Sequence, residues 1–342
     1  MKDICDFILK LLQLGDPVVK IGNKLLYTGV ALLGGGVVVQ VSHKLFSLDV
    51  YVNEAGYWST ITGLFLIALS VAFYMFYVMQ RKKDAPYLYY FKGMDNMDPE
   101  PPEKFLPSRD RLFMKSTPYP LNSYDKQQLA GLFNTLKYNV EERTESMHAS
   151  HVYLAGLGSF PLLFLVGVFM RNAYARDLYL MDYDRNKGAW YVLEDGENND
   201  IPIHMYSGRP LDPLVDAKTI LQDDPDEVGI ALSYTFEIPP EQLPQNVRDH
   251  TMILTLSSKH GHDKIMTIAA QKKLLNDISI IINTFGKDRQ RKIHLFASAQ
   301  ASFCLALGKN YMPNAHHGVV LHNYAKNDGY DWSVTYDDGE IS

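Results

Sequence analysis

The chain has 342 residues, of which 46% are hydrophobic and 21% charged, so it has room for one or two globular domains and further segments. Its formal net charge of -6 argues against a broad polynucleotide-binding surface, because such a surface needs clustered lysines and arginines to neutralise many phosphates. A small anionic ligand in a local pocket remains compatible with this charge. Cys5 and Cys304 lie far apart without metal-ligand spacing around them, so we predict reduced core cysteines and no metal site.

Two uncharged apolar stretches near the N-terminus have the length of membrane-spanning helices. Residues 25–41 and 61–79 contain no charged side chain, and each can cross about 30 Å of hydrocarbon as a helix. Lysines precede the first stretch and a basic cluster, 81–83, follows the second, so we expect both termini on the cytoplasmic side. Residues 1–83 are therefore predicted to form a short N-terminal helix and a two-transmembrane hairpin.

Small residues within both stretches favour close packing of the two helices. The first stretch contains the run Gly34, Gly35 and Gly36, and the second contains Ala68 and Ala72 at a spacing of four. No carboxylate or arginine lies inside either stretch, so an ion or proton path is not indicated.

The next segment, residues 84–122, reads as a linker. Seven prolines recur among charged residues there, so regular helix is not expected, although some ordered pieces are. A helix begins near Ser123, and the remaining sequence, 123–342, is predicted to form a soluble domain.

This domain contains one unit twice. A strand, a turn of small residues, an apolar helix and two further strands occupy 150–195, and the same order recurs over 292–336. Val152 matches Ile293, and the spacing (293 − 152 = 141) also relates Gly167 to Gly308 and Tyr183 to Tyr324 without a gap. The apolar helix of the first copy is too short for a full membrane crossing, so we predict a core helix. The domain is therefore predicted to contain two Rossmann-like halves, at about 123–240 and 245–342.

Ligands of such sheets bind beyond the carboxyl ends of the strands, where loops and helix N-termini meet. The turn after the first strand of each copy offers backbone N–H groups to phosphate oxygens, although its glycines and alanines also suit a plain tight turn. The loop "SSKHGHDK" adds hydroxyls and basic groups, and three tyrosines could stack on bases or simply pack in the sheet. The predicted ligand-binding residues are Gly156, Leu157, Gly158, Ser159, Phe160, Tyr183, Tyr234, Ser257, Ser258, Lys259, His260, Ser298, Gln300 and Tyr324.

Catalytic signatures are not found. The sequence has no nucleophile elbow, no paired carboxylates at a recognisable spacing, no G-x-G-x-x-G fingerprint and no P-loop. We therefore predict a binding protein without catalytic residues and without a resident cofactor.

The segments "HVYLAGLGSFPLLFLVGVFM" with "YLMDYD", and "KIHLFASAQASFCLALGKNYMPNAHHGVVLHNY", resemble the two halves of SAVED domains, which are CARF-related sensors of bacterial CBASS anti-phage systems. The resemblance covers about Ser123 to Tyr336 and is more specific in the second copy. The first copy departs from it, with Phe160 and Pro161 where the second has Ala301 and Ser302. The implied fold is a membrane-anchored α/β protein, in which a transmembrane helical hairpin precedes a SAVED domain of two fused CARF-like halves.

The resemblance also implies a function. SAVED domains bind a cyclic oligonucleotide, here a di- or trinucleotide, made by a partner nucleotidyltransferase (CD-NTase). We expect the protein to self-associate head to tail and to act on membrane lipid, which disrupts the bacterial inner membrane. Arrest or death of the infected cell would follow. Two alternatives stay open: a CARF-like ring nuclease, with Lys259 or His260 as first suspects, and a membrane receptor that recruits another protein.

Overall fold

The structure is a computed structural model in which the chain forms two units, Met1–Ala85 with Pro107–Met114 and Pro86–Leu106 with Lys115–Ser342. The described residues are 16–46, 54–83, 85–93, 99–120, 131, 133–135, 137–138, 151–171, 178–196, 202–257, 260–261, 265, 267–287, 291–312, 318–325, 329–337 and 339–342. The predicted N-terminal helix within residues 1–15 and most of the helix predicted from Ser123 lie outside them.

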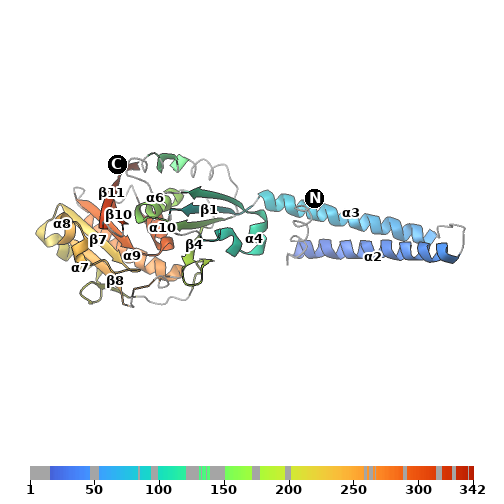
Figure 1. Cartoon of the computed structure of the whole chain (residues 1–342), viewed down its shortest axis with the longest axis horizontal. Helices are drawn as coiled ribbons and strands as arrows, with labels where there is room; N and C mark the ends of the chain where they lie inside the picture. Colours follow the sequence, from blue (N-terminus) through green and yellow to red (C-terminus); the bar gives the residue numbers. More distant parts are fainter. Residues whose placement is uncertain are drawn as a thin grey trace. The chain divides into compact units, whose positions relative to one another are not determined.

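Two long helices, α2 (Pro17–Phe46) and α3 (Glu54–Lys83), pack along each other in the first unit (Figure 1). Their backbones come closest where Gly29 faces Gly63: a Cβ built on Gly29 would lie 2.7 Å from the Gly63 carbonyl oxygen. Within the described residues, one helix, Tyr57–Lys82, is long and apolar enough to cross a membrane.

Hydroxyl groups of α3 add hydrogen bonds to this helix pair. Ser70 Oγ donates to the Gly22 carbonyl at 2.8 Å, and Ser59 Oγ donates to the Leu32 carbonyl at 3.0 Å. Ala68 and Ala72, predicted to lie between the helices, are exposed instead, because the side of α3 that faces α2 carries Gly63 and Ser70. The contacts of the Gly34–Gly36 run lie outside the described part of the structure.

The second unit contains two largely parallel sheets. The first has the strand order β2-β1-β3-β4-β5, in which only β5 is antiparallel to its neighbour. Its strands are β1 (Tyr87–Lys92), β2 (Lys115–Pro120), β3 (Val152–Leu157), β4 (Leu178–Asp184) and β5 (Ala189–Val192).

The second sheet has the order β12-β11-β10-β9-β7-β8-β6, with a parallel centre formed by β10, β9, β7 and β8. Its strands are β6 (Ile203–Met205), β7 (Glu227–Ser233), β8 (Thr251–Leu256), β9 (Lys292–Ser298), β10 (Val319–Ala325), β11 (Gly329–Asp337) and β12 (Glu340–Ile341).

Both sheets begin earlier in the chain than the sequence predicts. The segment 84–122, read as a linker, supplies β1 and β2 to the first sheet, and β7 enters the second sheet well before residue 245. Strand β1 is a run of buried aromatic residues, which favour strands. Strand β2 lies at the edge, the position where a sheet tolerates prolines such as Pro118 and Pro120.

The duplicated unit is visible in the strand pairing. Tyr87 of β1 pairs with Val152 of β3, and Val228 of β7 pairs with Ile293 of β9, so the 141-residue spacing extends to the strand before each copy (228 − 87 = 141). The series β1-β3-β4-β5 and β7-β9-β10-β11 have the same order and directions.

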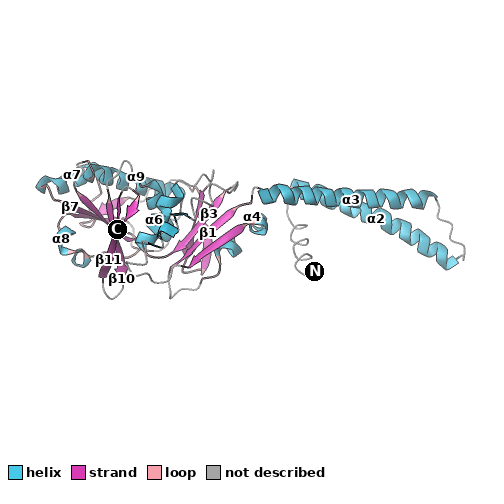
Figure 2. Ribbon diagram, turned by 90° about the horizontal axis from the view of Figure 1, so that it is seen from above, coloured by secondary structure: helices cyan, strands magenta, loops and turns pink. Residues whose placement is uncertain are grey.

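The helices of the two copies, α6 (Phe160–Arg171) and α10 (Ala301–Asn310), pack between the two sheets (Figures 1 and 2). They come closest at the equivalent glycines: a Cβ on Gly308 would lie 1.8 Å from the Phe164 carbonyl oxygen, and one on Gly167 would lie 2.1 Å from the Leu305 carbonyl oxygen. Residues from Phe160 to Met170 are all buried, so this helix is a core element, as predicted. One hydrophobic core therefore joins the two halves.

The remaining helical elements pack on either face of the second sheet or connect strands. They are η1 (Pro102–Phe105), α4 (Ser108–Phe113), α7 (Pro213–Ile220), η2 (Leu221–Asp223), η3 (Pro240–Gln242), α8 (Gln245–Arg248) and α9 (Ile268–Phe285).

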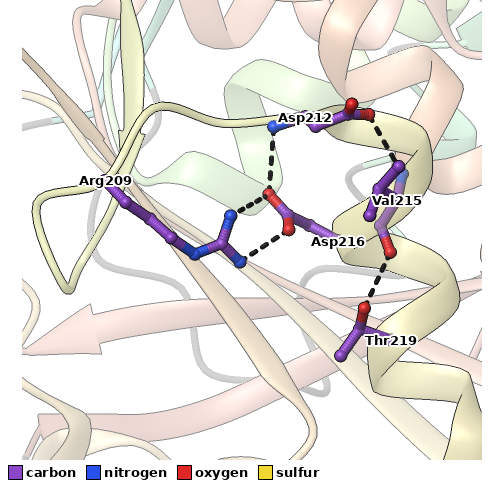
Figure 3. Close-up of polar contacts among 5 residues, drawn as sticks. All are labelled: Arg209, Asp212, Val215, Asp216 and Thr219. Carbon is purple, nitrogen blue, oxygen red and sulfur yellow. Dashed lines mark hydrogen bonds and ion pairs between the residues drawn. The ribbon is translucent and has the colours of Figure 1, made fainter.

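A polar cluster fixes the start of α7, which packs against α9 (Figure 3). Asp212 caps the helix by accepting the Val215 N–H at 3.1 Å. Asp216 accepts both terminal nitrogens of Arg209, at 3.0 and 2.5 Å, and the Asp212 N–H at 3.0 Å. The forked geometry is the one in which a guanidinium binds a carboxylate most tightly, so this cluster anchors α7.

Candidate functional site

The carboxyl ends of β7, β8 and β9 lie side by side in the second sheet. Ser233 at the end of β7 is in register with Ser298 at the end of β9, and Ser257 follows β8 directly. We call this region the second-half edge and define it by Ser233–Phe236, Ser257, His260 and Ser298. Such an edge is where ligands of parallel α/β sheets bind.

Ser298 fixes the chain that leaves β7. Its carbonyl oxygen accepts the N–H groups of Tyr234 and Thr235, at 3.0 and 2.7 Å, and its Oγ accepts the Phe236 N–H at 2.9 Å. Three consecutive residues of this loop are therefore held by one serine, which aligns the loop with the end of β9.

Ser233 and His260 form a second contact at the second-half edge. Ser233 Oγ accepts the Ile238 N–H at 2.9 Å and lies 3.2 Å from both the Phe236 carbonyl and His260 Nε2. The hydroxyl has one proton, so when it donates to the carbonyl, His260 must donate through Nε2–H. The His260 side chain is exposed and Ser233 is fully buried, so the imidazole is the accessible partner.

Tyr234, a predicted stacking residue, is buried in the core. Its ring is 1% exposed and packs edge-on against Phe303 of α10, with 5.6 Å between the ring centres. Burial raises the pKa of its hydroxyl, which has no hydrogen-bond partner among the described residues. Stacking on a ligand base would require this ring to leave the core, whereas Ser257 and His260 are exposed.

The N-terminus of α10, a predicted phosphate site, is filled by a side chain of the first half. The Asp182 carboxylate of β4 accepts the Ser302 hydroxyl at 2.7 Å and the Gln300 amide Nε2 at 3.1 Å. It also accepts the Tyr183 backbone N–H at 2.8 Å. A carboxylate at a helix N-terminus satisfies the same N–H groups and dipole that would otherwise attract a phosphate. Burial raises the pKa of Asp182, although these hydrogen bonds oppose the rise.

Gln300, predicted to contact ligand, uses its whole amide inside the protein. Its Oε1 accepts the Ile265 N–H at 2.7 Å, while Nε2 lies 3.1 Å from Asp182 and 3.3 Å from the Tyr191 hydroxyl. Gln271 of α9 donates to Ser302 Oγ at 3.0 Å. Gln300 therefore connects the two halves, and its side chain is buried.

The corresponding turn in the first half is packed by the helix that follows it. A Cβ built on Gly156 would lie 2.7 Å from Leu163 Cδ2, and one on Gly158 would lie 2.9 Å from Leu162 Cδ2. Leu157 and Phe160 are buried, which leaves Gly158 and Ser159 as the partly accessible residues of this predicted group. Both glycines here serve the close packing of α6 on β3, the plain structural alternative that the sequence left open.

Tyr183 and Tyr324 occupy equivalent places near the ends of β4 and β10. The Tyr183 ring packs on Trp190 at 5.3 Å, and the Tyr324 ring packs on Tyr330 at 5.5 Å. Tyr183 is half-buried and Tyr324 is exposed. Ser258 and Lys259 lie outside the described residues, so the sequence alone supports their place in the site.

Sequence reasoning missed two buried polar groups. Asp182 could have been recognised from the sequence, since an aspartate inside the apolar strand "YLMDYD" needs buried partners.

The pairing of His294 with His322 could not have been recognised from the sequence, because the two residues lie on different strands. His294 Nδ1 lies 2.8 Å from His322 Nε2, a hydrogen bond too short for a metal ion between them. Within the described residues, no group of three or more histidine, cysteine or acidic side chains could hold a metal.

Solved structures that match this chain include Cap4 SAVED/CARF-domain containing receptors. The Acinetobacter baumannii receptor with the cyclic trinucleotide 3'3'3'-cAAA has a TM-score of 0.46 and 12% identity, covering 86% of this chain and 64% of that one. The Moraxella osloensis receptor has a TM-score of 0.42 and 14% identity, covering 88% and 62%. This chain thus spans less than two thirds of each receptor's length. No curated protein matches the sequence.

The family comparison is more direct. Residues 136–335 match the model of the SAVED family, the "SMODS-associated and fused to various effectors sensor domain". The match covers more than half of the chain and includes strands β3 to β10, most of β11, helices α6 and α10 and the whole second-half edge. The chain therefore belongs to the SAVED family of sensor domains.

Proposed function

We propose that this protein is a membrane-bound anti-phage effector that senses a cyclic oligonucleotide through its SAVED domain. The observation that carries the proposal is the second-half edge, where the carboxyl ends of three parallel strands lie together beside the exposed side chains of Ser257 and His260, in a member of a sensor family. Hydroxyl, imidazole and backbone N–H groups are suitable partners for phosphate and ribose oxygens. The ligand itself would come from a partner CD-NTase.

The phosphates of this ligand bind at the second-half edge and not at the N-terminus of α10. The latter already holds the Asp182 carboxylate, and a second anion there would be repelled. Positive charge comes from Lys259, which lies in the loop between Ser257 and His260. The first half contributes Gly158 and Ser159, its accessible turn residues.

The hairpin of α2 and α3 inserts in the bacterial inner membrane, with both termini in the cytoplasm. Large apolar side chains of α3 point away from α2, and Phe65 and Phe76 are each 64% exposed. Side chains of this size and polarity are suited to lipid. Ligand-driven head-to-tail contacts between SAVED domains would gather the hairpins, and the gathered hairpins disrupt the bilayer.

Catalysis is not part of the proposal. The Ser233–His260 contact resembles a nucleophile with its base, but Ser233 is fully buried and its Oγ already accepts the Ile238 N–H. Labelled cyclic nucleotides incubated with the protein should therefore be recovered intact. Linear product would support the ring nuclease instead.

The first test measures binding by the detergent-solubilised full chain. Titration calorimetry with 3'3'3'-cAAA, 2'3'3'-cAAA and a panel of cyclic dinucleotides should show saturable binding of at least one compound, with linear AAA as the control. Absence of binding across the panel would overturn the proposed ligand class.

A second test addresses the membrane. Liposomes that contain the full chain and a self-quenching dye should release the dye when the bound cyclic nucleotide is added. Vesicles that remain sealed despite ligand binding would favour the receptor that recruits another protein.

A further inference from the structure

A continuous chain of buried hydrogen bonds links the first half to the loops of the second-half edge. It runs from the Ile265 N–H to Gln300, from Gln300 to Asp182, and from Asp182 to Ser302 and Gln271. These residues lie on five segments of the domain: the loop after β8, the turn after β9, strand β4, helix α10 and helix α9.

Two of these segments lead directly into the second-half edge. Gln300 follows Ser298 by two residues, and Ile265 lies in the same connection between β8 and α9 as Ser257 and His260. Asp182 itself is 4% exposed, so it cannot contact a ligand in this arrangement. Its contribution to binding must pass through Gln300 and Ser302, which it orients.

We propose that Asp182 is a positioning residue through which the first half of the SAVED domain holds the second-half edge in its ligand-binding geometry. This inference rests on the proposed function, because it concerns the same site. The β4–β5 hairpin is thereby coupled to ligand binding, although its own side chains, apart from Tyr183, were not predicted to contact ligand. Removing the carboxylate frees the turn after β9 together with Ile265, because Gln300 of that turn donates to Asp182 and accepts the Ile265 N–H.

The physical basis is that a carboxylate only accepts hydrogen bonds. Asp182 receives donors from Ser302, Gln300 and Tyr183 at once, and charged acceptors make stronger bonds than neutral ones. In Asp182→Asn one oxygen becomes an NH2 donor, so at least one of these three donors loses its acceptor. A buried donor without an acceptor destabilises the fold more than an exposed one, because it cannot bind water instead. We therefore expect the hydrogen bonds around it to rearrange.

The experiment compares Asp182→Asn and Ser302→Ala with a matched control, Arg209→Ala, in the full chain. The control opens the ion pair between the half-exposed Arg209 and the buried Asp216 (Figure 3). Within the described residues, this pair makes no hydrogen bond to the network. Two quantities are measured: hydrogen exchange of peptides covering 257–266 and 298–303 without ligand, and the Kd for the cyclic nucleotide that the wild type binds.

We expect both network variants to exchange faster in the two peptides and to bind about tenfold more weakly, as for the loss of one charged hydrogen bond. Arg209→Ala should lower the unfolding temperature without either change. Wild-type exchange and affinity in Asp182→Asn would overturn the inference, and if that variant does not fold, Ser302→Ala decides by the same criteria.

Failure of the proposed function gives a different result. If the wild type binds no cyclic nucleotide, the ligand class is wrong, and the exchange measurement still decides whether Asp182 holds these loops. Faster exchange confined to the two peptides would support the positioning role, and unchanged exchange would refute it.

Discussion

His294 and His322 show how burial controls individual titratable residues in this domain. The two rings stack at 5.1 Å, Phe296 stacks on His322 at 4.2 Å, and Glu227 and Lys292 are the charged groups near His294. Burial and the neighbouring His294 lower the pKa of His322 to about 3. Burial also lowers the pKa of His294, against the opposing effect of Glu227. Both rings are therefore neutral at neutral pH.

This pair makes the folded protein sensitive to acid. Below the ordinary histidine pKa of 6.5, these histidines are protonated in the unfolded chain but stay neutral in the folded protein. The free energy of unfolding is therefore at its full value above pH 6.5 and decreases as the pH approaches 3. The slope for one such group approaches about 1.4 kcal/mol per pH unit. We expect His322→Phe, which keeps the ring stack, to lose less stability than wild type in urea unfolding between pH 7 and pH 4.5. Identical slopes for the two proteins would contradict this assignment.

Single residues also show where sequence reasoning ends. Strand, turn and helix around Gly156 and Ser298 were predictable, because small residues between apolar runs are a local signal. The occupant of the α10 N-terminus was not, because Asp182 and Ser302 are distant in sequence and meet only through the packing of the two halves. Tyr234 illustrates the same point, because a tyrosine at a strand end can face either a ligand or the core. Its ring packs against Phe303 in the core, a contact that the sequence does not reveal.

Among the elements, α6 and α10 depend on having no side chain where they cross. A Cβ at residue 308 would lie 1.8 Å from a backbone oxygen, which cannot rotate away as a side chain could. We expect Gly308→Ala to destabilise the SAVED domain by at least about 3 kcal/mol, measured by chemical unfolding.

Gly131→Ala provides the control for this substitution. Gly131 is helical and exposed, and a Cβ there meets nothing within 4 Å. Its replacement should raise stability by about 0.5–1 kcal/mol through helix propensity. If both substitutions changed the free energy of unfolding equally, the contact between α6 and α10 would tolerate a side chain, which would contradict this prediction.

The pairing of α2 with α3 depends on Gly63 in the same way. A Cβ there would lie 2.8 Å from the Gly29 carbonyl oxygen, so Gly63→Leu should separate the helices, whereas Ala68→Leu adds bulk to an exposed position. Cysteines at positions 32 and 59, which the Ser59–Leu32 hydrogen bond brings together, report the pairing. Oxidation in membranes should cross-link Ala68→Leu like wild type and Gly63→Leu poorly. Efficient cross-linking in both would show that the glycine contact is dispensable.

The elements were predictable to different degrees. The repeat at 141 residues was visible because apolar strands and helices recur in order, and the strand pairing follows it from β1 onward. Strands β1 and β2 were missed because prolines outweighed the aromatic run from Tyr87 to Phe91. Helix α3 was predictable from the length and the apolar composition of its sequence alone.

At the scale of the whole molecule, binding and assembly should be lost together. Lys259→Glu reverses a charge beside the proposed phosphates, so we expect at least about tenfold weaker binding of the cyclic nucleotide and no ligand-induced growth in light scattering. Lys292→Glu is the matched control, because Lys292 is exposed and lies at the amino end of β9, whereas Ser298 of the proposed site lies at its carboxyl end. A Lys259→Glu protein that binds like wild type would remove the loop from the site.

The crossing of α6 and α10 also limits how such a chain could be shortened. Each of these helices is covered by the other half, so a chain that ended between the two sheets would expose a wholly apolar helix, from Phe160 to Met170, to water. Neither copy can therefore be deleted without exposing the helix of the other. A substitution at Gly167 or Gly308 also affects the packing of the helix opposite it. We expect new ligand specificities to arise by sequence changes in the loops at the strand ends, where the packing of the two helices is not involved.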